Sequence, residues 1–109
     1  MALLTRSEEL ILLAVYKLRG DAYCVSIRKM LTRITGEKWS LGSIYMPIER
    51  MLRNGLLKSY MSESTPERGG RQKRIYQLTR EGEIALTRIH SIQDKMWSDV
   101  TNLSPECES

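Results

Sequence analysis

The sequence has little of the chemistry that enzymes and metal sites need. It contains one histidine, His90, and two cysteines, Cys24 and Cys107, which do not form a C-x-x-C pair. These three residues cannot complete a zinc site. The chain also has neither a G-x-S-x-G nucleophile motif nor a phosphate-binding G-x-x-x-x-G-K-[ST] loop. We therefore expect no catalytic residue, no metal and no cofactor, and a protein that is not an enzyme.

Long apolar runs and secretion signals are missing as well. Arg6, Glu8 and Glu9 interrupt the apolar N-terminus too early for a signal peptide. No stretch approaches the roughly 18 consecutive apolar residues of a membrane span. Two cysteines without a pairing motif suit a reducing compartment. We expect a cytoplasmic protein with no membrane partner.

Length and composition are those of one small globular domain. The chain has 109 residues, of which 41% are hydrophobic and 28% charged, and its net charge is +4. A chain of this size buries a modest core, so an oligomer is expected. The charge is uneven, because acidic residues dominate after Arg80. The segment 68–80 holds five basic residues and no acid: Arg68, Arg71, Lys73, Arg74 and Arg80. On charge alone, it is either a polyanion site or a solvated basic loop.

Two N-terminal segments have the periodicity of amphipathic helices. Thr5 and Glu8 have the spacing of a capping box, which predicts a helix from about Thr5 to Leu18. A second helix is expected from about Cys24 to Ile34, followed by Gly36 as a C-cap. The expected apolar residues of the first helix are Leu10, Leu13, Ala14 and Leu18, broadened by Ile11 and Val15. Those of the second are Val25, Ile27, Met30, Leu31 and Ile34.

A third helix is expected from Ser40, a good N-cap residue, to Asn54. At about 100° per residue, its apolar side consists of Leu41, Ile44, Ile48, Met51 and Leu52. Its opposite side carries Ser43, Met46, Pro47, Arg50 and Arg53. Pro47 conflicts with a helix, because proline removes an N–H donor and bends the axis. The helix is retained because the apolar stripe continues on both sides of Pro47.

The rest of the chain predicts a β-hairpin and a long helix. Two strands are expected at about 56–63 and 72–78, joined by a segment rich in turn residues. The last helix is expected to begin at Thr79 and to reach Leu103, a length of roughly 36 Å. Its apolar residues have nearly heptad spacing: Ala85, Ile89, Ile92, Met96, Val100 and Leu103.

Three helices followed by a hairpin are typical of a winged helix-turn-helix. The expected fold class is therefore mainly α with a two-stranded β-hairpin. The third helix would offer a polar face of major-groove width, and the basic hairpin beside it would reach phosphates or the minor groove. The expected organisation is a DNA-binding domain at 1–78, a C-terminal dimerisation helix at 79–104 and a tail at 105–109.

Several motifs in this order carry a family resemblance. They are L-T-R-S-E-E-L-I-L-L-A-V at 4–15, W-S-L-G-S-I-Y at 39–45 and T-P-E-R-G-G-R-Q-K-R-I-Y-Q-L-T-R-E-G at 65–82. The sequence thereby resembles the PadR family of bacterial transcriptional regulators over nearly its whole length. The resemblance implies a cytoplasmic, nucleoid-associated repressor that dimerises through its terminal helices and binds a palindromic operator. Some members of that family release DNA when flat aromatic molecules bind at the dimer interface. Met46 and Pro47 fall where the family varies, so operator preference does not transfer.

The candidate DNA contacts come from the second helix, the third helix and the hairpin. Ser43, Met46 and Arg50 are expected to contact the groove, and Arg50 would hydrogen-bond a guanine edge or a phosphate. Arg28 on the second helix is expected to touch a flanking phosphate, and its alternative is a solvated face.

Ser40 is expected to reach a phosphate at the start of the third helix, and Tyr45 to pack in the core with its hydroxyl toward a phosphate. The hairpin cations are expected to contact phosphates, with Arg68 or Arg71 entering the minor groove. The alternative for each is a solvated helix face or a charged hairpin. The full set is Ser40, Ser43, Tyr45, Met46, Arg50, Arg68, Arg71, Lys73, Arg74 and Arg28.

The heptad residues of the last helix are expected to form a dimer contact, and the alternative is packing against the first helix of the same chain. Trp97, next to Met96, could stack a planar ligand at that interface or pack there without one. The expected partners are double-stranded DNA, a second copy of the chain and a small aromatic effector. The alternative function is a winged-helix module that binds protein and not DNA.

Overall fold

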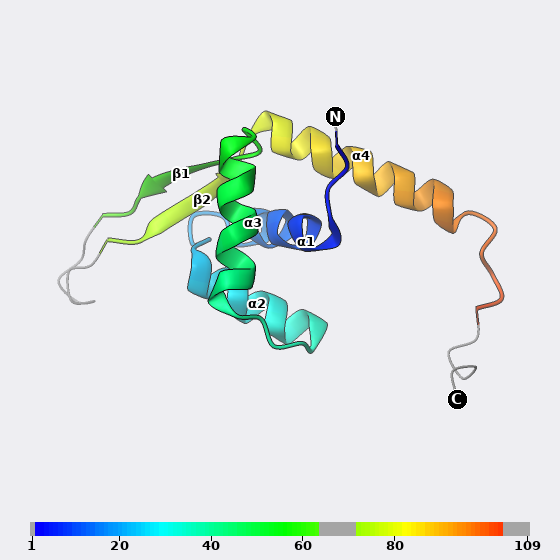
Figure 1. The fold of residues 1–109 in the computed structure, drawn as a ribbon, viewed down its shortest axis with the longest axis horizontal. Coiled ribbons are helices and arrows are strands. Elements are labelled where there is room, and N and C mark those ends of the chain that lie inside the picture. Colours follow the sequence, from blue (N-terminus) through cyan, green and yellow to red (C-terminus); the bar gives the residue numbers. More distant parts are fainter. Residues whose placement is uncertain (1, 64–71, 104–109) are drawn as a thin grey trace.

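The structure is a computed structural model that describes residues 2–63 and 72–103. In chain order its elements are α1 (Arg6–Lys17), α2 (Cys24–Thr35), α3 (Leu41–Arg53), β1 (Leu57–Met61), β2 (Arg74–Leu78) and α4 (Arg80–Trp97). Figure 1 shows α3 in front of α1, with α2 below, the hairpin on one side and α4 extending away on the other. This arrangement confirms the expected winged helix-turn-helix.

The first helix begins with the predicted capping box. The Thr5 hydroxyl accepts a hydrogen bond from the Glu8 N–H at 3.1 Å, and the Glu8 carboxylate accepts one from the Thr5 N–H at 2.9 Å. The predicted apolar face was partly wrong, because Leu13 is exposed and Leu12, which was not predicted, is fully buried. Since α1 packs against α2, α3, β2 and α4, its buried face is wider than one stripe and turns away from Leu13.

The turn between α2 and α3 is bounded by the two capping residues that the sequence predicts, Gly36 and Ser40. Gly36 caps α2 with a left-handed φ of 74°, which glycine adopts without strain. The Ser40 hydroxyl caps α3 by accepting the N–H of Ser43 at 3.1 Å. Two predicted apolar residues are exposed instead, Ile34 at the end of α2 and Leu41 at the start of α3, because neither helix end is covered by a neighbouring element.

Pro47 lies inside α3, as predicted, but on its buried side and not on its polar side. It is three residues after Ile44 and four before Met51, and both are fully buried. This i, i+3, i+7 spacing places the three side chains on one face of the helix. The proline ring therefore serves as an apolar core group, which corrects its expected place on the DNA-facing side.

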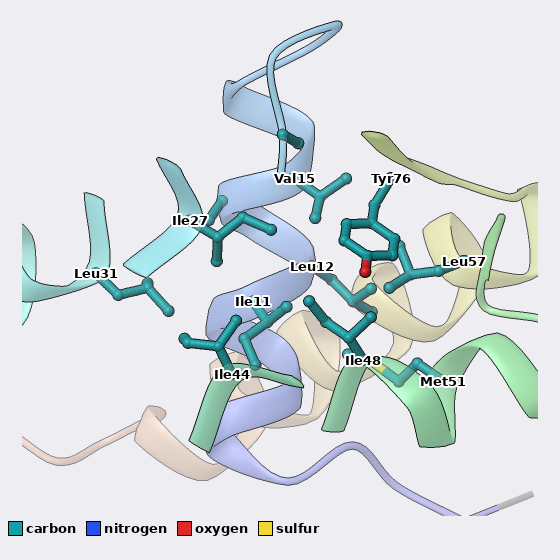
Figure 2. Packing of buried hydrophobic residues seen from close by; sticks show 12 residues of the cluster. Ile11, Leu12, Val15, Ile27, Leu31, Ile44, Ile48, Met51, Leu57 and Tyr76 are labelled. Atoms are coloured by element: carbon teal, nitrogen blue, oxygen red, sulfur yellow. The ribbon is translucent and has the colours of Figure 1, made fainter. Parts of the chain in front are cut away.

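The hairpin is antiparallel, with Leu57 opposite Leu78 and Met61 opposite Arg74. Its strands are shorter than predicted, and residues 64–71 lie outside the described part of the chain. The N–H of Tyr76 donates to the carbonyl of Ala22 at 2.8 Å, which fixes β2 to the α1–α2 connection. Figure 2 shows the Tyr76 ring close to Val15, Leu12 and Leu57, within the core that the first three helices and the hairpin share.

The last helix is shorter than predicted and ends at Trp97, six residues before Leu103. Its 18 residues span about 27 Å and not the expected 36 Å. The backbone of Asp99 has a left-handed φ of 68°, which takes the chain out of the helix. Val100 and Leu103 therefore follow α4 and do not extend its helical face.

Gly82, in the first turn of α4, is a position where a side chain has no room. A Cβ atom there would overlap the carbonyl oxygen of Leu56 and lie 3.0 Å from a methyl carbon of Leu78. The Gly82→Ala variant should therefore lose about 1–3 kcal/mol of unfolding free energy, measured by urea denaturation. Gly42→Ala is the matched control, because a Cβ there meets only the Ser40 hydroxyl at 4.0 Å. Equal stabilities for the two variants would contradict this packing.

Candidate nucleic-acid interface

One side of α3 faces away from the rest of the molecule (Figure 1). It consists of residues at helical spacing opposite the buried Ile44, Ile48 and Met51. Gly42, Tyr45, Met46 and Arg53 are exposed on it, so the expected packing of Tyr45 in the core is wrong, and Glu49 is half-buried at its edge. We call these five residues the outer stripe of α3. Met46, a predicted groove contact, is 63% exposed at its centre, and an α-helix presented in this way fits the width of a major groove.

The predicted contacts Ser40 and Ser43 are exposed at the start of α3. Their side chains already serve the helix end, since the Ser40 hydroxyl accepts the Ser43 N–H and the Ser43 hydroxyl donates to the Ser40 carbonyl at 2.7 Å. The N–H groups of a helix start attract anions. The two serines therefore fix the position of this helix end, and their contact with DNA stays a prediction.

Arg50 is held at the edge of α3 by a carboxylate of α1. Its Nε donates to Glu8 Oε2 at 3.2 Å. The Glu8 side chain is 11% exposed, whereas that of Arg50 is 46% exposed. Because a buried carboxylate is costly without a partner, the cation is committed to Glu8. The geometry favours a structural role for Arg50, and base reading by this residue is untested.

Glu9, beside Glu8, is also buried but is directed to a different helix. Gln93 of α4 donates to Glu9 Oε1 at 3.0 Å, and Arg6 Nη1 lies 3.7 Å from the same oxygen. Two adjacent carboxylates on α1 therefore join the start of α1 to α3 and to α4. Sequence reasoning did not find these roles, because the partners are 42 and 84 residues away along the chain.

The hairpin lies beside the outer stripe of α3 and is joined to it by an ion pair. Arg74 of β2 donates from Nε to Ser59 of β1 at 3.1 Å, and its Nη1 lies 3.5 Å from Glu49 Oε2 of α3. The predicted cation Lys73 has its Nζ 4.2 Å from the centroid of the Tyr23 ring, a cation–π geometry. Arg68 and Arg71, the other predicted cations, lie outside the described residues.

Arg28 of α2 is half-buried, and its Nε is a buried donor with no partner among the described residues. The solvated face that was its alternative is therefore wrong for this nitrogen. Its predicted contact with a flanking phosphate remains a prediction.

Cys24 and Tyr76 adjoin the ion pair of Arg74 and Glu49 without contributing reactive groups. Burial raises the pKa of the Cys24 thiol. Burial, with the nearby Cys24 as the next cause, raises the pKa of the Tyr76 phenol to about 12. Both groups are therefore neutral at physiological pH, and the thiolate of Cys24, which nucleophilic chemistry would need, is disfavoured.

The predicted dimer residues of α4 fall into two groups. Ala85 and Ile89 are buried within their own chain, where α4 packs on α1, as the alternative interpretation proposed. Ile92 is half-buried at the boundary. Beyond it, Met96 is 73% exposed and Trp97 60% exposed. With Val100 and Leu103, these two side chains line a shallow apolar hollow of about 190 Å³.

Neither metal ligation nor membrane insertion is indicated by the described residues. Residues 2–63 and 72–103 contain no group of three His, Cys, Asp or Glu side chains arranged to hold a metal ion. No helix in this part of the chain combines the length and apolarity that crossing a membrane requires.

The third helix, α3, has an exposed stripe and is joined to a hairpin on the same surface. This arrangement, with α3 as the recognition helix, defines the class of winged helix-turn-helix proteins. The PadR-like family of transcriptional regulators matches residues 12–88, so the chain belongs to this family. Membership confirms DNA-binding regulation as its activity and confirms that it is not an enzyme.

Solved structures of similar fold include several regulators. A transcriptional regulator from Clostridium thermocellum is 22% identical with a TM-score of 0.70, over 86% of this chain and 85% of that one. A PadR family regulator from Clostridium difficile R20291 is 27% identical with a TM-score of 0.63, over 88% and 91% of the two chains. RosR of H. salinarum is 23% identical with a TM-score of 0.66, over 88% and 79%. No curated protein matches the chain.

The pairing of Arg50 with Glu8 predicts a loss of stability when the cation is removed. Arg50→Ala leaves the buried Glu8 carboxylate without its partner and should cost about 1–2 kcal/mol of unfolding free energy, moderated because Arg50 is itself half exposed. Arg53→Ala removes an exposed cation from the same helix and should change stability by less than about 0.5 kcal/mol. Chemical denaturation of both variants measures the difference. If Arg50→Ala proves as stable as Arg53→Ala, solvent satisfies Glu8 and the pair has no structural role.

Proposed function

We propose that the chain is a repressor that binds a palindromic operator as a homodimer, in the cytoplasm of a bacterium and on its nucleoid. The observation that supports this most is the ion pair between Glu49 and Arg74. It joins the outer stripe of α3 to β2, so that a helix suited to the major groove and a cationic strand belong to one surface. Repression follows from steric competition, since a protein seated in the groove occupies the site that the transcription machinery needs.

The DNA contacts of this proposal are those of the stripe and of the hairpin. Tyr45 and Met46 would contact thymine methyl groups, because their exposed atoms are largely apolar. Arg68, Arg71 and Lys73 would contact phosphates, as would Ser40 and Ser43 from the start of α3 and Arg28 from within α2. The phosphate contacts fix the register of the protein on DNA without reading its sequence.

A second copy is supported by the end of α4. Met96, Trp97 and Leu103 are each at least 60% exposed, and they are contiguous with Val100. An apolar group of this size at the tip of a helix that leaves the domain suits association of two chains, since burial of apolar surface drives association. A symmetric pair would place two copies of α3 about 34 Å apart on one side of the duplex.

The operator test uses selection of bound fragments from random duplex DNA, followed by anisotropy titrations. We expect a palindrome, two chains per duplex and an affinity whose logarithm falls with log salt by roughly 0.9 for each neutralised phosphate. If the affinity for DNA at physiological salt does not depend on the DNA sequence, the proposal of an operator-specific repressor is contradicted. No duplex affinity at all would favour the alternative, a winged-helix module that binds protein.

A small aromatic effector would act through Trp97. This indole is 60% exposed in the apolar hollow at the end of α4, where a planar molecule could stack on it between two copies. In a Trp39→Phe background, where Trp97 is the only tryptophan, planar aromatic compounds should quench fluorescence and weaken operator binding together. Quenching without a change in operator affinity, or no quenching, would remove the effector from the proposal.

A further inference from the structure

Glu49 is the one acidic residue of the outer stripe of α3, and we propose that it determines operator specificity by accepting a hydrogen bond from the 4-amino group of a cytosine, with Arg74 as its positioning residue. This inference rests on the proposed function, because it needs α3 in the major groove. It adds a residue that the sequence patterns did not single out. The juxtaposition that carries it is a carboxylate held at the edge of the stripe by a cation from β2.

The position of Glu49 on α3 gives it access to base edges. It lies three residues after Met46 and four residues before Arg53, so the three side chains share one face. Met46 is 63% exposed at the centre of that face. The Glu49 side chain is 29% exposed, so part of its carboxylate is open to solvent in the free protein. A helix that seats Met46 against bases brings Glu49 to the neighbouring base pair.

Arg74 fixes the orientation of this carboxylate. Its guanidinium donates from Nε to Ser59 at 3.1 Å, which ties it to the hairpin, and its Nη1 approaches Glu49 Oε2 at 3.5 Å. Its carbon Cζ lies 5.8 Å from the centroid of the Tyr76 ring, a second restraint from a core residue. None of the side-chain hydrogen bonds among residues 2–63 and 72–103 uses Glu49 Oε1. One oxygen is thus held by Arg74, and the other is available as an acceptor.

Electrostatics explains why a carboxylate on this surface needs the pair. Phosphates repel an isolated carboxylate, and a glutamate without a counterion would oppose DNA binding at every sequence. Arg74 offsets that charge at contact distance. Cytosine is the base that presents an amino donor without an adjacent acceptor in the major groove, and Glu or Asp is the side chain that accepts from it. The pair therefore converts an unfavourable charge into a base-specific acceptor.

The test measures the affinity of the selected operator and of duplexes with each base pair replaced in turn. For the unchanged chain, replacing one C·G pair per half-site by A·T should weaken binding roughly ten- to hundredfold. Glu49→Gln should reverse the preference at that position alone, because glutamine pairs with adenine N6 and N7. Glu49→Ala should lose the preference without gaining adenine. Glu83→Gln, an exposed carboxylate on α4, controls for the loss of one negative charge.

Other outcomes overturn the inference in distinguishable ways. If Glu49→Gln and Glu49→Ala keep the base preference at every position and only tighten binding to all duplexes, Glu49 is merely a counterion of Arg74. If Arg74→Ala weakens binding to all duplexes alike, Arg74 is a phosphate contact. If Arg74 is a positioning residue, the Arg74→Ala variant should lose the base preference at that one position, and Arg74→Lys should restore it. If the unchanged chain selects no duplex, the proposed function itself fails, and this inference fails with it.

Discussion

Glu8 and Glu9 are consecutive carboxylates at the start of α1, and they are 8% and 7% exposed. A charge so far removed from solvent persists only with partners, and each of these two takes its partner from a different helix. Glu8 accepts from Arg50 of α3, and Glu9 accepts from Gln93 of α4. The first turn of α1 therefore fixes the recognition helix on one side and the terminal helix on the other. The capping box belongs to the same constraint, because the Glu8 carboxylate also holds the N–H of Thr5.

This constraint changes which residues of α3 are free to meet DNA. Arg50 has the charge and reach for a guanine or a phosphate, but releasing it would leave Glu8 buried without a cation. Met46 and Arg53 of the outer stripe are exposed and have no such pairing among the described residues. The recognition surface is thus shifted by part of a turn toward the hairpin. That shift brings it to Glu49, where Arg74 joins helix and hairpin.

Local signals in the sequence predicted the order of the elements and the starts of the helices well, because capping and turn chemistry depend on near neighbours, but the end of α4 and the lengths of the strands were wrong. Thr5, Gly36 and Ser40 each cap the helix that they were expected to cap. The predicted side-chain roles failed where tertiary packing decides them. Pro47 is buried because α3 packs against both α1 and α2 and its apolar face is wide, and a single sequence does not reveal how wide that face is. Arg50 and Arg74 could be recognised as cations, but their carboxylate partners lie 42 and 25 residues away.

The terminal helix shows how one apolar seam can serve two purposes. Its spacing is continuous from Ala85 to Met96, and periodicity alone cannot divide it. The structure divides it at Ile92 and Gln93: before them Ala85 and Ile89 are buried on α1, and after them the apolar side chains are exposed. Gln93, which is held by Glu9, therefore marks the boundary between the part of α4 that belongs to its own domain and the part that leaves it. Because Glu9 adjoins Glu8, α4 at Gln93 and α3 at Arg50 are anchored by neighbouring carboxylates within one turn of α1, each through its own hydrogen bond.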